Sequence, residues 1–188
     1  MKEELLEEYK MLKDEIQNCV ERDNSLSTFM VTAVATILTF AISANLQLPF
    51  LFLISFCIII PFSARIAHYK GNVARISAYI IVYLESELNI KYETRNIQVK
   101  NPNSKKSKLL ISMRNYVGLW LGIISYAIYL EEYIQKIGLN NIFDFIFCVL
   151  PVLLLILTFI IDRKIDNVPA TRNIWLELFK KNKDEVSK

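Results

Sequence analysis

His68 is the only histidine in the chain, and the short stretch around it holds the side chains best suited to binding a ligand. The polar residues of this stretch recur every three or four positions, so a helix would place them on one face. They are Arg65, His68, Asn72, Arg75 and Tyr79. Guanidinium and imidazole groups bind anionic oxygens. This face is therefore a candidate site for an anion, a nucleotide-like signal or lipid headgroups.

The same stretch also fits a purely structural interpretation. Arg65 and Lys70 directly follow a long uncharged segment, where basic residues commonly flank a membrane span. In that case His68 occupies an ordinary helix face. Arg75 would then pair with an acid of another helix, such as Glu85 or Asp162. The residue types alone leave both interpretations open.

A second pattern consists of hydroxyl side chains within an otherwise apolar segment. Its members share one helical stripe: Thr28, Thr32, Thr36, Thr39 and Ser43. Small and hydroxyl residues allow helices in a membrane to approach closely. After oligomerisation they could also line a narrow wet pore. Packing and pore lining both remain possible from the sequence.

No catalytic motif is present, so we expect a protein that is not an enzyme and has no cofactor. The chain contains no P-loop, no nucleophile elbow and no HExxH sequence. Its cysteines, Cys19, Cys57 and Cys148, form no CxxC pair, and with a single histidine no metal-ligand spacing results. The net charge of +3 is small and no nucleic-acid-binding motif occurs, so no nucleic-acid partner is expected.

Three long uncharged stretches define the elements that must position these residues. They lie between Asp23 and Arg65, between Arg114 and Glu131, and between Asp144 and Asp162. A spanning helix needs about 20 mostly apolar residues, so the first stretch accommodates two spans and the others one each. The polar segment "NLQLP" divides the first stretch. We therefore predict an all-α integral membrane protein with four transmembrane helices at 25–44, 49–66, 115–133 and 143–161.

The distribution of Lys and Arg predicts the orientation of these spans. In a four-span arrangement, all but one of the 22 basic residues fall in 1–24, 65–114 or 162–188, and the exception is Lys136. Basic residues concentrate on the cytoplasmic side of a membrane. We expect a multi-pass protein of the cell inner (plasma) membrane with both termini in the cytoplasm.

Five segments follow from these spans. They are an amphipathic cytoplasmic helix (1–24), a transmembrane hairpin (25–66), a cytoplasmic helix and loop (67–114), a second hairpin (115–161) and a cytoplasmic C-terminal segment with a short helix (162–188). The sequence "DNSLS" at 23–27 offers N-caps for a new helix at the first span. The second span is expected to continue as one helix to about Leu88, followed by a loop with a short strand at Asn96–Val99.

The layout of residues 1–90 resembles the SLATT group of bacterial defence effectors. The features that carry this resemblance are an amphipathic helix, two spans joined by a tight outer turn, and a long helix that leaves the membrane. The whole chain is also similar, more loosely, to small four-span membrane components of phage-defence operons. The resemblance implies an oligomer that perturbs the membrane when a cytoplasmic partner signals infection, and it assigns no functional residue.

The sequence is compatible with two functions. The first is an oligomeric, channel-like membrane effector of antiviral defence, a homo-oligomer triggered through its cytoplasmic helices. The second is a non-conducting membrane anchor or scaffold that recruits a cytoplasmic partner protein through 65–88 and the terminal helices. A transporter subunit is disfavoured, because no ionisable residue lies at the middle of a predicted span.

Overall fold

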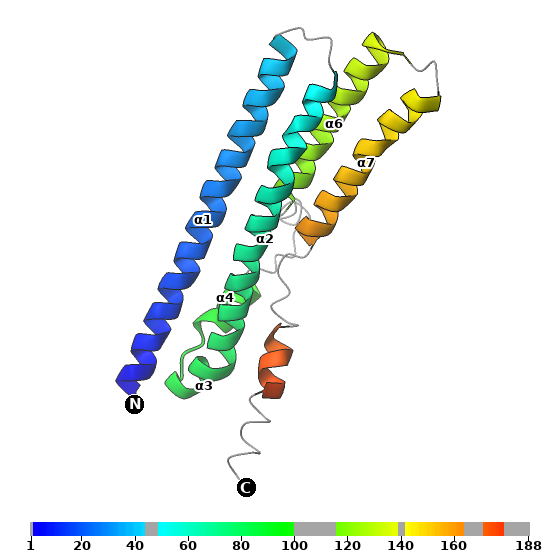
Figure 1. The fold of residues 1–188 in the computed structure, drawn as a ribbon. Coiled ribbons are helices and arrows are strands. Elements are labelled where there is room, and N and C mark those ends of the chain that lie inside the picture. Colours follow the sequence, from blue (N-terminus) through cyan, green and yellow to red (C-terminus); the bar gives the residue numbers. More distant parts are fainter. Residues whose placement is uncertain (1, 44–48, 100–115, 139–141, 164–170, 179–188) are drawn as a thin grey trace. The chain divides into compact units, whose positions relative to one another are not determined.

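The computed structural model of the 188-residue chain describes residues 2–43, 49–99, 116–138, 142–163 and 171–178. Every regular element in these ranges is helical (Figure 1). In chain order the elements are α1 (Lys2–Ser43), the 3₁₀ segment η1 (Pro49–Ile54), α2 (Ser55–Tyr79), the π-helical segment η2 (Ile80–Leu84), α3 (Glu85–Leu88), α4 (Tyr92–Val99), α6 (Val117–Lys136) and α7 (Ile142–Arg163). A last helix at 171–178 is called the C-terminal helix below.

Four helical stretches are long and apolar enough to cross a membrane. They are α1, the run Pro49–Leu88, α6 and Asp144–Arg163 within α7. This confirms the prediction of an all-helical chain with four helices of spanning length. The first two have 42 and 40 residues. Each therefore extends well beyond the roughly 20 residues that a bilayer requires.

The first helix differs from its prediction, because α1 runs without a break through residues 23–27. The expected N-cap at "DNSLS" is therefore wrong. An N-cap needs a non-helical backbone, but these residues lie inside α1. Cys19 and Met30, about three turns apart on one face, are both buried. Burial on both sides of the polar segment favours a continuous helix over two separate ones.

The second long helix follows the predicted course from Pro49 to Leu88, with local changes in its winding. It begins as the 3₁₀ segment η1, carries Pro61 inside α2, and widens to a π-helix in η2. It ends at Asn89, whose left-handed backbone (φ 55°) places its own N–H on the Glu85 carbonyl. Asparagine tolerates this conformation better than most residues, which explains the stop at this position.

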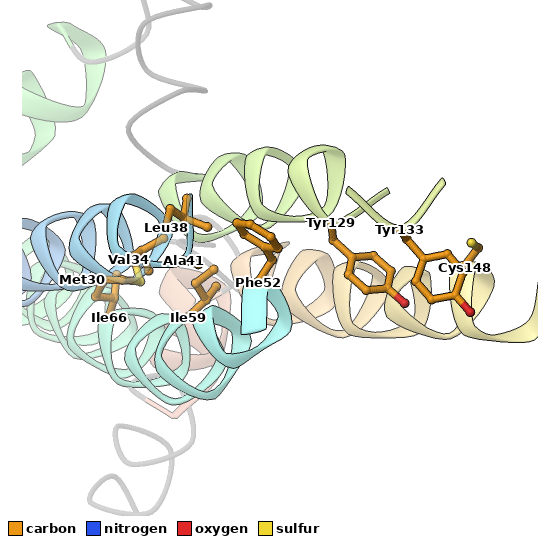
Figure 2. Packing of buried hydrophobic residues seen from close by; sticks show 10 residues of the cluster. All are labelled: Met30, Val34, Leu38, Ala41, Phe52, Ile59, Ile66, Tyr129, Tyr133 and Cys148. Carbon is orange, nitrogen blue, oxygen red and sulfur yellow. The ribbon is translucent and has the colours of Figure 1, made fainter. Parts of the chain in front are cut away.

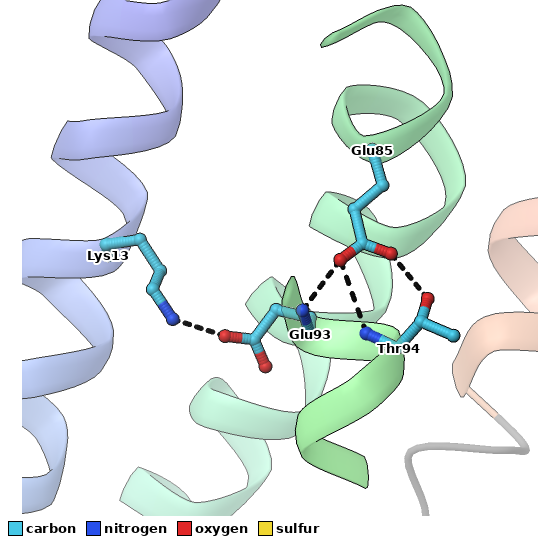
Figure 3. Close-up of polar contacts among 4 residues, drawn as sticks. All are labelled: Lys13, Glu85, Glu93 and Thr94. Atoms are coloured by element: carbon cyan, nitrogen blue, oxygen red, sulfur yellow. Dashed lines mark hydrogen bonds and ion pairs between the residues drawn. The ribbon is translucent and has the colours of Figure 1, made fainter. Parts of the chain in front are cut away.

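The expected strand at Asn96–Val99 is wrong, because these residues belong to helix α4. The Glu85 carboxylate lies at the start of α4 (Figure 3). Its Oε1 accepts the backbone N–H of Glu93 at 2.6 Å and that of Thr94 at 3.2 Å, and its Oε2 accepts the Thr94 hydroxyl. A carboxylate that binds the free N–H groups of a first turn stabilises the helix. This cap comes from outside the segment, so local alternation could not reveal it.

The chain divides into two compact units, each assembled from segments that are far apart in the sequence. The charged unit comprises Met1–Asp23, His68–Leu109 and Ile165–Lys188. The apolar unit comprises Asn24–Ala67 and Leu110–Lys164. Helices α1 and α2 each contribute one end to the charged unit and the other end to the apolar unit.

The core of the apolar unit is a cluster of buried side chains from α1, η1, α2, α6 and α7 (Figure 2). Its members are Met30, Val34, Leu38, Ala41, Phe52, Ile59, Ile66, Tyr129, Tyr133 and Cys148. Helices α1 and α2 also meet through Phe29 and Phe62, whose stacked ring centroids lie 5.4 Å apart. One face of each helix is thus committed to contacts within the chain.

Helix α6 approaches its neighbours closely at the two glycines of "GLWLG". A Cβ atom at Gly118 would overlap Ser63 Oγ, and one at Gly122 would lie 2.9 Å from Leu155 Cδ2. Both glycines are buried, as expected for a motif that permits close helix packing. The buried Asp162 completes this end of the bundle, because its Oδ2 accepts the Leu119 N–H at 3.0 Å in the first turn of α6.

Candidate functional site

The charged unit contains a cavity of about 550 Å³. Its lining comes from α1, from α2 and from the C-terminal helix. The lining residues are Glu8, Leu12, Glu15, His68, Asn72, Arg75, Ile76, Tyr79 and Trp175. Pockets that hold small ligands commonly measure roughly 300–1,000 Å³ and combine apolar walls with a few polar groups. This cavity has both features.

Four of the five residues of the predicted binding face line this cavity. His68, Asn72, Arg75 and Tyr79 contribute to its wall, and Arg65 does not. Arg65 lies in the segment Asn24–Ala67 of the apolar unit. The helical spacing therefore identified residues that share a cavity, but it extended the face one turn too far toward the N-terminus of α2.

The basic side of the cavity is a chain of three side chains one turn apart on α2. Arg75 Nη2 donates a hydrogen bond to Asn72 Oδ1 at 2.5 Å, and Asn72 Nδ2 lies 3.3 Å from His68 Nε2. The amide of Asn72 thereby holds both neighbours in place. A neutral His68 accepts the amide hydrogen at Nε2 and keeps Nδ1 as its own donor.

The ion pairs that the structural interpretation assigned to Arg75 do not form. Within the described residues its guanidinium has no carboxylate within ion-pair distance. Glu85 instead caps α4, and Asp162 caps α6. A guanidinium carries five N–H donors. Within the described residues, Arg75 makes one side-chain hydrogen bond, to Asn72. Its other N–H donors remain available to a ligand.

The acidic side of the cavity comes from α1. Glu8 Oε1 accepts the Tyr79 hydroxyl hydrogen at 2.8 Å. Burial, together with this hydrogen bond to Glu8, raises the pKa of Tyr79 to about 12. Tyr79 is therefore a neutral hydrogen-bond donor at physiological pH. Glu15, two turns further along α1, is exposed and makes no side-chain hydrogen bond or ion pair to another described residue.

Two of the lining residues, Tyr79 and Trp175, belong to a cluster of three aromatic rings with Tyr83. Tyr79 and Tyr83 stack with ring centroids 5.0 Å apart, and Trp175 meets them edge-on at 5.3 and 6.0 Å. Such pairs contribute about 0.5–1.5 kcal/mol each beyond simple burial. They attach the C-terminal helix to α2 within the charged unit. Helical spacing could not predict this contact, because Trp175 lies far along the chain from both tyrosines.

The side chains that line the cavity can bind a ligand through charge and hydrogen bonds. No group of three His, Cys, Asp or Glu side chains is placed to hold a metal ion in the part of the chain that the structure describes. The cavity offers a guanidinium, an imidazole, an amide, a phenol and two carboxylates, and no hydroxyl or thiol nucleophile. Sequence reasoning missed Glu8, Leu12 and Glu15, which reach the cavity from the acidic helix at the N-terminus.

The predicted hydroxyl stripe forms the outer face of α1 in the apolar unit. All of its members are exposed: Thr28, Thr32, Thr36, Thr39 and Ser43. With about 3.6 residues per turn they lie opposite the buried residues Met30, Val34 and Leu38. Thr32 Oγ1 donates to the Thr28 carbonyl at 3.0 Å, and Thr36 Oγ1 donates to the Thr32 carbonyl at 2.8 Å. The stripe is thus not used in packing within the described chain.

The outer face of α7 has a different character. Before the charged end at Asp162 and Arg163, its exposed residues are all bulky and apolar: Phe145, Ile146, Phe147, Val149, Leu150, Leu153, Ile156, Leu157, Phe159 and Ile160. Side chains of this type suit contact with lipid tails. The exposed face of α7 thus lacks hydroxyl side chains, whereas the hydroxyl stripe of α1 is flanked by the exposed apolar residues Phe29, Val31, Phe40 and Ile42.

Comparison with known proteins adds no further constraint on this site. No protein-family model, curated protein or solved structure matches the chain. The chemistry of the cavity and of the α1 surface therefore indicates the function.

Proposed function

We propose that the chain is an integral protein of the bacterial inner membrane with four spans and with both termini in the cytoplasm. Four helices of sufficient length and hydropathy support insertion. The concentration of Lys and Arg in 1–24, 65–114 and 162–188 supports the orientation. The charged unit is then the cytoplasmic part of the protein, and the apolar unit is the membrane part.

The function that we propose is that of an oligomeric, channel-like membrane effector. The observation that carries this proposal is the exposed hydroxyl face of α1, opposite the face that packs inside the chain. Small and hydroxyl residues favour close contact between helices in lipid, whereas the bulky face of α7 suits lipid itself. We therefore expect α1 to pack against a second copy of the chain and α7 to contact lipid.

The charged unit is the proposed trigger of this effector. Helices α1 and α2 extend from the cavity residues into the membrane part as continuous helices. A ligand or partner protein that moves Glu8 relative to Arg75 would act on both helices, and helices transmit such displacements. The resemblance to SLATT proteins extends this proposal to antiphage defence.

A second candidate is a non-conducting anchor that holds a cytoplasmic partner protein at the membrane. One observation favours it. The hydroxyls of Thr32 and Thr36 bond carbonyls of their own helix, an arrangement that satisfies them without water. In this case α1 lines no path, and the anchor needs no second copy of the chain.

The mass of the protein in lipid nanodiscs, measured by native mass spectrometry, tests the proposal. We expect a closed oligomer for the wild type and a smaller species for Thr32→Leu combined with Thr36→Leu, because the added bulk separates the helices. A matched control, Leu153→Phe with Leu157→Phe, adds bulk on the exposed face of α7 and should leave the mass unchanged. A monomeric wild type would contradict the effector and leave the anchor.

Dye release from liposomes then separates the two candidates. An effector releases dye when its trigger is present, and the threonine double variant releases less. An oligomer that never releases dye, including with its cellular partners added, would be an anchor.

A further inference from the structure

We propose that the cavity of the charged unit binds a small molecule that carries both an anionic and a cationic group. The anionic group lies against Arg75 and His68, and the cationic group lies against Glu8 and Glu15. This inference rests on the proposed function in one respect, since that function makes the cavity the site of the trigger.

The charges on the cavity wall come from different helices. Arg75 and His68 belong to α2, and Glu8 and Glu15 belong to α1. Arg75 has no carboxylate partner among the described residues, and Glu15 has no cationic one. Arg75, His68 and Glu15 are exposed to solvent, so a ligand in the cavity can reach charges of both signs. Such charge complementarity confers specificity on a binding site.

A ligand of single charge fits this wall less well. An anion near Arg75 also meets the carboxylates of Glu8 and Glu15, which repel it. A cation near these carboxylates meets the guanidinium of Arg75. A molecule with both charges satisfies each group with a charge-assisted hydrogen bond, which is stronger than a bond between neutral groups.

The uncharged lining residues indicate the chemistry of the rest of the ligand. Leu12, Ile76 and Trp175 provide apolar surface in the same cavity. The volume of about 550 Å³ lies within the usual range for small ligands. Two sources supply this chemistry. One is a lipid headgroup with a phosphate and an ammonium group, and the other is a free zwitterion such as an apolar amino acid.

Tryptophan fluorescence of the full chain in nanodiscs measures binding directly. The chain has two tryptophans. Replacing the half-exposed Trp120 by phenylalanine leaves Trp175, at the cavity, as the only reporter. The zwitterionic probes are glycerophosphoethanolamine and leucine. Glycerol phosphate carries only the anionic group, and ethanolamine only the cationic group.

We expect at least one zwitterionic probe to bind about tenfold more tightly than either single-charge probe, as the loss of one charged hydrogen bond predicts. Arg75→Gln and Glu15→Gln should each weaken that binding by about tenfold. Arg172→Gln and Glu177→Gln, which change exposed residues of the C-terminal helix outside the cavity, should not. Equal binding of a single-charge probe, or no response to any probe, would overturn the proposal.

The lipid composition of the nanodisc identifies the source of the ligand. If the ligand is a lipid headgroup, phosphatidylethanolamine discs should shift the Trp175 emission and block the free probe, while phosphatidylglycerol discs should not. A free ligand would bind equally in both. If the Thr32→Leu, Thr36→Leu variant forms a smaller species and still binds the probe, the binding site does not depend on the proposed oligomer.

Discussion

Tyr79 donates a 2.8 Å hydrogen bond to Glu8, a residue 71 positions earlier in the chain. The bond joins α1 to α2 inside the charged unit, at the wall of the cavity. Lys13 and Glu93 form a second link from α1, to α4 (Figure 3). The Lys13 ammonium also lies 4.1 Å from the centre of the Tyr92 ring. Polar contacts between distant segments therefore act beside buried apolar residues such as Ile80 and Leu84 in holding the charged unit together.

Removal of the Tyr79 hydroxyl should loosen this end of α1. Tyr79→Phe keeps the ring stack with Tyr83 but leaves Glu8 without its donor, and we expect a loss of about 1 kcal/mol in the free energy of unfolding of the charged unit. Hydrogen exchange at the amides of 5–15 measures the effect. Tyr92→Phe, whose side chain is exposed, is the control. Unchanged protection in Tyr79→Phe would show that the bond contributes nothing to stability.

The same bond predicts a dependence on alkaline pH. Burial and the bond to Glu8 raise the pKa of Tyr79 from 10.0 to about 12 in the folded chain. The folded state thus favours the neutral phenol, so its contribution to stability is complete below pH 10 and is lost as the pH rises through about 12. The difference in phenolate absorbance between wild type and Tyr79→Phe should have a midpoint near pH 12. A midpoint at pH 10 would exclude the buried, bonded phenol.

The cap that Glu85 provides should decide whether α4 forms. Glu85→Ala removes the acceptor of the Glu93 and Thr94 N–H groups, at a cost of about 1–3 kcal/mol. We expect the amides of 93–95 to lose their protection from hydrogen exchange. Glu85→Gln retains one neutral acceptor and should have a smaller effect. Glu87→Ala changes an exposed acid in the same short helix and should have none, whereas equal losses in all three variants would contradict the cap.

The glycines of α6 and α2 should respond in opposite ways to an added methyl group. Gly122→Ala places a Cβ atom against Leu155 and Phe56, and such overpacking costs about 1–3 kcal/mol. Gly71→Ala meets no atom within 4 Å and should stabilise the helix by up to about 1 kcal/mol. Thermal unfolding in detergent micelles compares the two. A lowered melting temperature for Gly71→Ala would mean that this face is covered by something outside the described chain.

The sequence predicted those features that depend on local composition. Uncharged stretches located the four long helices, and Asn89 marked the end of the second. The features that it missed depend on contacts between distant residues. Glu85 caps α4, where the sequence predicted a strand, and Trp175 contacts Tyr79 from about half a chain length away. For the same reason only part of the cavity was predicted. Helical periodicity identified four of the residues of α2 that line it, but it could not show that Glu8 and Glu15 of α1 line it too.

The proposed orientation can be tested with two engineered cysteines in a chain whose three natural cysteines are replaced. Glu87 and Gln135 are both exposed and lie in segments expected on opposite sides of the membrane. Because Lys136 is the only basic residue on the far side, we expect Gln135→Cys to react with an impermeant maleimide in intact spheroplasts. Glu87→Cys should react only after the membrane is opened. Labelling of both positions from the same side would exclude the four-span arrangement. Labelling of Glu87→Cys in intact spheroplasts would exclude the cytoplasmic location of the cavity.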